Sequence, residues 1–200
     1  MANNPTTLTD PSGLNYWEAV SLFLSIQAYI AMHSSDSSHP TPPRPRGQTT
    51  TDPAAPTPIP TPKPKPPHFE YKQNTGDTDV KVGATEIAHV GTGYAGHGEG
   101  LKNPANQSVS EKEDKENAGP LPQGQYSIGP MFDNKGSTGP ASMRLTPDPN
   151  NEMFGRDRFL IHGPVPGETC PCSSEGCIVL PRAERVTIGV SGIDTLEVVQ

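Results

Sequence analysis

Short apolar runs separated by glycine- and proline-rich turns dominate the chain from residue 68 to residue 200. Frequent turns between short strands are typical of β-sandwiches and β-barrels. One short helix is expected at Arg182–Val190, ahead of a last strand at Thr195–Val199. The other expected strands are Phe69–Gln73, Asp79–Val82, Thr85–Val90, Gln125–Gly129, Ser142–Leu145, Phe159–His162 and Cys177–Leu180. The pattern therefore predicts a mainly β domain, a sandwich or barrel with one short helix, over residues 68–200.

A different pattern comes first: the apolar run LNYWEAVSLFLSIQAYIAM covers residues 14–32. Asp10 followed by Pro11 resembles the start of a helix, so one helix is expected within residues 1–39. The run fits a secretion signal, a membrane span, or a helix that docks on a partner or on the domain itself.

Charge distinguishes these three interpretations. The first lysine or arginine is Arg44, so the positively charged start of a signal peptide is absent. Glu18 and Gln27 interrupt the apolar run, which weakens the case for a membrane span. We therefore expect a docking helix.

Residues 40–67 hold twelve of the 25 prolines, interleaved with threonine and lysine. Such a segment lacks the N–H donors and the apolar side chains that a core needs. It is expected to be a disordered, extended polyproline-II spacer between residues 1–39 and the domain of residues 68–200. A P-x-x-P ligand for a partner domain is the alternative.

Composition narrows the function. The apolar fraction is 31%, against roughly 45–50% for an average globular protein, which agrees with a chain that folds only in part. The formal charge is −7 and there is no basic stripe, so nucleic-acid binding is not expected. The three cysteines, Cys170, Cys172 and Cys177, fall within eight residues. This clustering indicates a local site rather than a disulfide framework.

The candidate chemistry lies between two expected strands. One strand ends at His162 and Gly163, and the run S-E-G-C leads through Gly176 and Cys177 into the next. A loop of this length can bring the imidazole and the thiol together, and a neighbouring imidazole raises the thiolate fraction. Gly176 lets the backbone approach a reacting carbonyl closely, where N–H groups can hold an oxyanion.

Three interpretations of the cluster are open on the residues alone. Cys177 can be a small buried hydrophobe with His162 as a core histidine. A metal site can form from His162, Cys170, Cys172 and Cys177, although the Cys-Pro-Cys spacing departs from the C-x₂₋₄-C pattern of structural zinc sites. The third interpretation is a Cys–His nucleophile pair.

The ordered set of motifs resembles the L,D-transpeptidase catalytic domain, in which a His-Gly at a strand end is followed by a loop and Ser-x-Gly-Cys. The usual signature has His where this chain has Glu175, and Arg where it has Val179. In these departures the chain is similar to the L,D-transpeptidase-like peptidoglycan effectors of type VI secretion systems. The resemblance spans roughly residues 69–200, and its further motifs are Gly93-Tyr94-Ala95-Gly96, Asn103-Pro104, Gly119 to Tyr126, Gly139-Pro140 and Gly155-Arg156.

The resemblance implies a role for each site residue, with no cofactor and no metal. Cys177 is the nucleophile and His162 the base, and Ser174 and the backbone near Gly163 orient the imidazole. Backbone groups at Gly176 and Gly163 serve the oxyanion. Tyr94 and Arg156 either contact the anionic stem or are structural.

The implied substrate is the peptidoglycan stem peptide, cleaved between meso-diaminopimelate at position three and D-Ala at position four. Water as acceptor gives L,D-carboxypeptidase activity, and a D-amino acid or another stem's amine gives exchange or cross-linking.

The implied protein is a secreted antibacterial toxin, made in the cytoplasm and acting in the target-cell periplasm. A cognate immunity protein is expected, as is a secretion-machinery component or chaperone bound by residues 1–39. Two alternatives stay open: a catalytically idle wall-binding module, and a housekeeping L,D-transpeptidase, which needs an export signal. Cys170 and Cys172 are either plain loop residues or disulfide partners that switch Cys177 off.

Overall fold

The computed structural model describes most of the chain after the proline-rich segment. The residues described are 65–134, 136, 138–165, 167, 170–172 and 174–200, together with Leu24, Ala28 and Ala31, which are helical. The docking helix expected within residues 1–39 and most of the expected spacer lie outside the described residues.

In this part of the chain, eight strands form one sheet in the order β3-β2-β1-β8-β4-β5-β6-β7. Their bounds are Pro67–Lys72 (β1), Asp77–Val82 (β2), Thr85–Thr92 (β3), Gly124–Ile128 (β4), Met143–Pro147 (β5), Leu160–His162 (β6), Ile178–Val179 (β7) and Thr195–Val199 (β8). The β1–β8 and β6–β7 pairs are parallel and the others antiparallel. The prediction of a mainly β domain with one short helix is confirmed.

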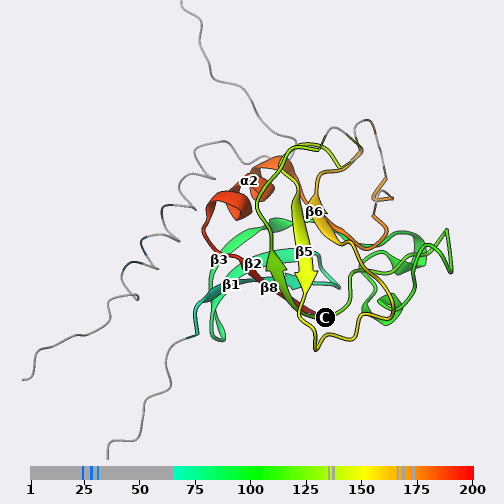
Figure 1. The fold of residues 1–200 in the computed structure, drawn as a ribbon, viewed down its shortest axis with the longest axis horizontal. Helices are drawn as coiled ribbons and strands as arrows, with labels where there is room; N and C mark the ends of the chain where they lie inside the picture. Colours follow the sequence, from blue (N-terminus) through cyan, green and yellow to red (C-terminus); the bar gives the residue numbers. More distant parts are fainter. Residues whose placement is uncertain are drawn as a thin grey trace, which may run out of the picture.

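The sheet curls so far that its two ends meet (Figure 1). Tyr94, two residues after the end strand β3, pairs antiparallel with Val179 of the other end strand, β7. The Tyr94 N–H donates to the Val179 carbonyl at 3.1 Å and the Val179 N–H donates to the Tyr94 carbonyl at 2.8 Å. This pair of hydrogen bonds joins β3 to β7 and gives the domain its barrel-like form.

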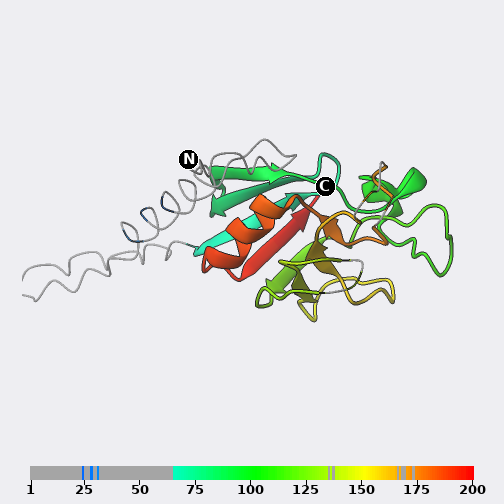
Figure 2. The ribbon, with the colours of Figure 1, turned by 90° about the horizontal axis from the view of Figure 1, so that it is seen from above.

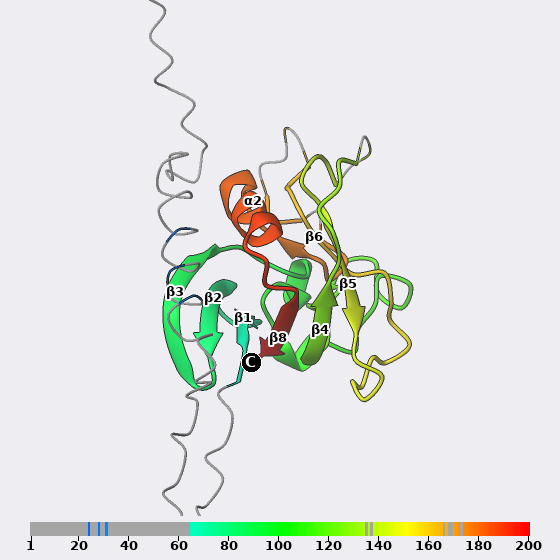
Figure 3. The ribbon, with the colours of Figure 1, turned by 60° about the vertical axis from the view of Figure 1, so that its left-hand side comes forward.

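The core fills the inside of the curl. Strand alternation is clearest in β8, where Leu196 and Val198 are buried between partly exposed neighbours. The adjacent β1 contributes Phe69 and Tyr71, both fully buried. Helix α2, Arg182–Val190, adds Ile188 and lies against β3 (Figure 2 and Figure 3). The bounds of α2 and β8 are the predicted ones.

A long connection, residues 93–123, joins β3 to β4 and carries two short 3-10 helices, Gly98–Gly100 and Pro104–Asn106. Gln73, fully buried after β1, holds this connection to the sheet. Its amide donates to the Leu121 carbonyl at 2.7 Å, and its carbonyl accepts from the Gln123 amide at 3.2 Å. The connection therefore has a fixed place beside β7, which matters for the site described next.

Gly93 tests whether closure of the curl stabilises the domain. An alanine Cβ there would collide with the Val179 carbonyl, so Gly93→Ala forces the two joined edges apart. We expect the free energy of unfolding to fall by about 2 kcal/mol, the usual cost of overpacking. Urea unfolding followed by circular dichroism measures it.

Gly129→Ala is the matched control, because the nearest atom to its Cβ would be the Arg144 carbonyl oxygen at 3.5 Å, an ordinary contact. It should change the unfolding free energy by less than about 1 kcal/mol. Equal losses in the two variants would contradict a special role for the closure.

Candidate active site

The parallel pairing of β6 with β7 places the strand that ends at His162 beside the strand that follows Cys177. In its register Ile161 lies opposite Ile178, and His162 lies opposite Val179. Residues two apart on an extended strand share a face, and partners across a ladder do so too. Val179 therefore lies in one row with its two partners, His162 on β6 and Tyr94 across the closing bridge. Cys177 comes two residues before Val179 in the sequence.

His162 is held in one tautomer. The residue is only 4% exposed, and its Nδ1 lies 2.7 Å from the Gly163 carbonyl oxygen. Because a carbonyl only accepts, Nδ1 carries a proton, which makes Nε2 the ring nitrogen that a general base would use. The Gly163 carbonyl thus orients the ring.

Ser174 organises the nucleophile turn, which we define as residues 174–177. Its hydroxyl donates to the Cys177 carbonyl at 2.6 Å and accepts the N–H groups of Gly96 and Gly176, each at 3.1 Å. These bonds go to backbone groups around the thiol, whereas the prediction gave the hydroxyl to the imidazole. Through Gly96 they also fix the turn to the β3–β4 connection.

The two predicted oxyanion glycines use their N–H groups inside the protein. The Gly176 N–H donates to the Ser174 hydroxyl, and the Gly163 N–H donates to the Thr138 carbonyl at 3.3 Å. What these two glycines provide is space, because each lacks a side chain where a guanidinium group lies close to the backbone. Gly176 has a φ of +115°, and a side chain there would collide with the Arg156 guanidinium.

Arg156 is buried beneath the turn rather than set along an open cleft. Its guanidinium donates to the carbonyl oxygens of Gln107, Gly119, Pro120 and Glu175 at 2.5–2.9 Å. Of the two predicted interpretations, these contacts favour the structural one. Tyr94 is half-buried at the closing bridge, in the same row as His162.

Two further residues support the site and carried no signal in the sequence. His97 spans two loops, with Nδ1 2.8 Å from the Ser174 carbonyl and Nε2 3.1 Å from the Lys115 carbonyl. Arg185, buried on α2, donates from Nε to the Leu180 carbonyl at 2.9 Å and lies against Gly163. A sequence shows these side chains but not the backbone carbonyls that they meet, which come from other segments of the fold.

The Cys177 thiol is neutral at physiological pH. The residue is partly exposed, but protein atoms surround the sulfur, and this burial raises its pKa to about 11. The Leu160 N–H, which donates to Sγ at 3.3 Å, acts in the opposite direction, as does the Arg156 charge. The Glu175 carboxylate adds to the rise. Attack by this sulfur therefore needs a base that takes the proton as the new bond forms.

Cys170 and Cys172 are disulfide-bonded to each other, and Cys177 is the free cysteine of the three. Neither of the two pairs with Cys177, so the pairing that would switch the thiol off is not the one formed. A disulfide sulfur is no thiolate ligand, so this bond also removes two of the four residues in the alternative metal site.

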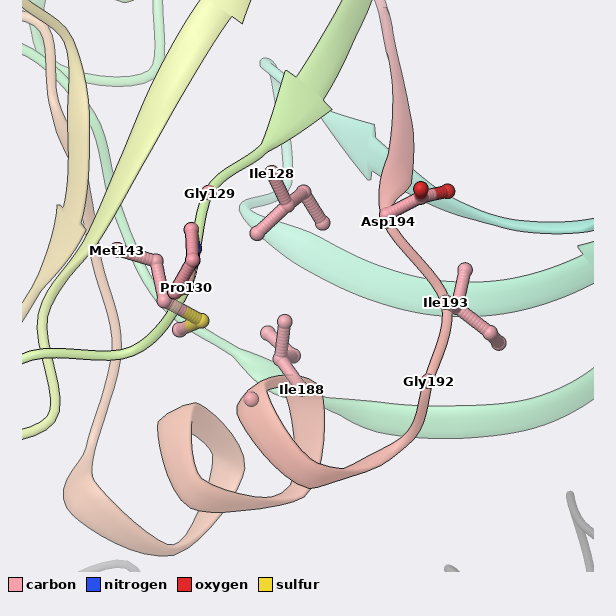
Figure 4. A pocket seen from close by; sticks show the side chains of 9 residues that line it. Ile128, Gly129, Pro130, Met143, Ile188, Gly192, Ile193 and Asp194 are labelled. Carbon is pink, nitrogen blue, oxygen red and sulfur yellow. The ribbon is translucent and has the colours of Figure 1, made fainter.

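A separate pocket of about 370 Å³ lies at the C-terminal end of α2 (Figure 4). Apolar side chains such as Ile128, Met143 and Ile188 face it, and Asp194 stands at its edge. None of the predicted site residues lines this pocket. Among the described residues, no helix has the length and apolar character needed to cross a membrane.

The curled sheet places the strand that ends at His162 beside the strand that follows the free Cys177. The family model of the Tlde1 domain matches residues 89–198, more than half of the chain. The chain therefore belongs to this family, the L,D-transpeptidase-like effectors of type VI secretion systems, as the motifs predicted. It is a secreted antibacterial effector that modifies peptidoglycan. No curated protein sequence and no solved structure matched it.

Glu175→Gln tests the electrostatics of the thiol. Removing this carboxylate takes away a negative charge that disfavours the thiolate, so the pKa of Cys177 should fall below about 11. We expect faster alkylation of Cys177 by iodoacetamide at pH 8, measured by mass spectrometry of its peptide. Glu152→Gln is the control, since Glu152 is not among the groups that shift this thiol. Equal alkylation rates in the parent chain and both variants would contradict the assignment.

Proposed function

We propose that the chain cleaves peptidoglycan tetrapeptide stems through a Cys177 thioester, as an L,D-carboxypeptidase, an L,D-transpeptidase or both. The observation that carries the proposal is the position of Cys177 directly before β7, which runs parallel to the strand β6 that ends at His162. The Leu160 N–H of β6 donates to Cys177 Sγ, and His162 Nδ1 is held by the Gly163 carbonyl. Family membership supplies the substrate class, peptidoglycan.

The first half of the reaction follows from the neutral thiol. His162 Nε2 takes the Cys177 proton while Sγ attacks the carbonyl of meso-diaminopimelate, because a thiol with a pKa of about 11 holds its proton until then. The tetrahedral intermediate carries an oxyanion, and the N–H groups of Leu160 and Cys177, which both stabilise the sulfur, are the candidate donors to it. The C–N bond to D-Ala then breaks, and the imidazolium gives its proton to the leaving amine.

The second half regenerates the thiol. An acceptor attacks the thioester while His162 again removes a proton, and the sulfur leaves with that proton returned. Water yields the tripeptide stem, and a D-amino acid or the amine of a second stem yields exchange or a cross-link. No step requires a cofactor or metal.

The remainder of the chain is assigned by the same proposal. Residues 68–200 are the catalytic domain, residues 40–67 the spacer, and residues 1–39 the segment that binds a secretion-machinery component or chaperone. The enzyme acts in the target-cell periplasm, where the wall lies, and the producing cell needs an immunity protein that covers the site.

The test is D-Ala release from a purified tetrapeptide muropeptide. The parent chain should release D-Ala, and Cys177→Ala and His162→Ala should reduce the rate by at least about a thousandfold. Cys170→Ser with Cys172→Ser is the matched control: it removes the other two cysteines and should keep the activity. Undiminished release by Cys177→Ala would remove this residue from the mechanism. Binding of the parent chain to sacculi without any turnover would favour the idle wall-binding module instead.

A further inference from the structure

Arg156 is a buried cation whose hydrogen bonds all go to neutral carbonyl oxygens. Nη1 donates to the carbonyl oxygens of Gln107 and Pro120, and Nη2 donates to those of Gly119 and Glu175. Within the described part of the chain, no carboxylate forms an ion pair with it. A buried charge without a counter-ion is costly, so its retention calls for a physical reason.

The first reason is geometric. Of the four carbonyls, the Glu175 carbonyl belongs to the nucleophile turn and the other three to the β3–β4 connection. The Leu121 N–H also donates to the Gly176 carbonyl at 2.9 Å, so residues 119–121 and the guanidinium hold the turn from two sides. Gly176 permits this approach, because any side chain there would overlap Nη2.

The second reason is electrostatic. Arg156 favours the thiolate form of Cys177, against the burial that disfavours it, and in turn the sulfur favours the charged arginine. The guanidinium lies 5.2 Å from the centre of the Phe159 ring, which shields it from water on one side. A fixed cation in this place, which forms no ion pair with the described carboxylates although the Glu113 charge acts on it, stabilises negative charge that appears on the sulfur during the reaction.

We propose that Arg156 is the positioning residue of the nucleophile turn: its planar fork sets the backbone that carries Cys177, and its charge stabilises the sulfur anion as it forms and leaves. This rests on the proposed function for the role of the sulfur. Arg156 itself does not touch the substrate.

Two substitutions separate the two effects. Arg156→Met removes the charge and the fork, and Arg156→Lys keeps the charge but lacks the planar set of donors. Arg144→Met is the matched control, since Arg144 is exposed on β5 and lies 5.9 Å from the Phe132 ring. All are tested in the full chain, with near-ultraviolet circular dichroism to show that each is folded.

The first readout is the pH dependence of Cys177 alkylation by iodoacetamide, which requires no turnover. For Arg156→Met we expect the rate at pH 8 to fall about tenfold and the profile to move to higher pH, the response to a rise of about one pKa unit. Arg156→Lys and Arg144→Met should stay within about threefold of the parent. A folded Arg156→Met with the parent's profile would overturn the electrostatic half of the proposal.

The second readout is D-Ala release. Arg156→Lys should lower kcat at least about tenfold with little change in KM, because the turn is misplaced while the stem still binds. A kcat equal to that of the parent would overturn the geometric half. If Arg156→Met does not fold, Arg156→Lys tests both the electrostatic and the geometric half. Because lysine keeps the charge, a shift of its alkylation profile to higher pH would contradict the electrostatic half. Failure of the proposed function is recognised by a different result, namely D-Ala release that the Cys177→Ala variant retains.

Discussion

The two hydrogen bonds exchanged between Tyr94 and Val179 join the ends of the curled sheet, and the arrangement of the site depends on them. Val179 is paired on one side with His162 and on the other with Tyr94. Closing the curl therefore does two things at once: it completes the barrel-like core, and it brings the β3–β4 connection against the turn that carries Cys177. Gly93 makes this approach possible because it has no side chain to meet the Val179 carbonyl.

The site combines a backbone that is fixed by hydrogen bonds with a thiol that stays protonated. Ser174, Arg156 and the residues around Leu121 hold the turn through backbone carbonyls and N–H groups. The thiol stays protonated because it is buried, and a buried neutral thiol resists oxidation and alkylation better than a thiolate does. Under the proposed mechanism a secreted enzyme gains from such restraint, since its nucleophile ionises only when His162 and a substrate carbonyl are both in place. Because Cys170 and Cys172 are bonded to each other, neither forms a disulfide with Cys177.

Much of the fold followed from local pattern. Alternation and turn residues placed the strands, and α2 and β8 have the predicted bounds. The strand expected at Cys177–Leu180 is shorter, Ile178–Val179, because Cys177 still belongs to the Ser174 turn. The pairing of residues 94 and 179 was beyond prediction, since it depends on the curl of the whole sheet rather than on any short run of sequence.

Part of the geometry around the site followed from the sequence. Motif order indicated His162 and Cys177, and the β6–β7 pairing places the strand that ends at His162 beside the one that follows Cys177. Their catalytic roles stay predictions. The partners of Ser174, Arg156 and the two glycines were not predictable, because which backbone groups a side chain meets is decided by loops far apart in sequence. His97 and Arg185 were missed for the same reason: the carbonyl groups that they meet, Ser174 and Lys115 for His97 and Ala141 for Arg185, come from distant segments.

The thioester on Cys177 is the central claim, and trapping it is the most direct test. The full chain is mixed with tetrapeptide stem, quenched in acid and examined by mass spectrometry of the intact protein and its peptides. The proposed mechanism predicts a tripeptide acyl group on the Cys177 peptide. This group should form as D-Ala is released, and hydroxylamine should remove it. An acyl group on another residue, or D-Ala release by protein whose Cys177 is fully alkylated, would contradict it.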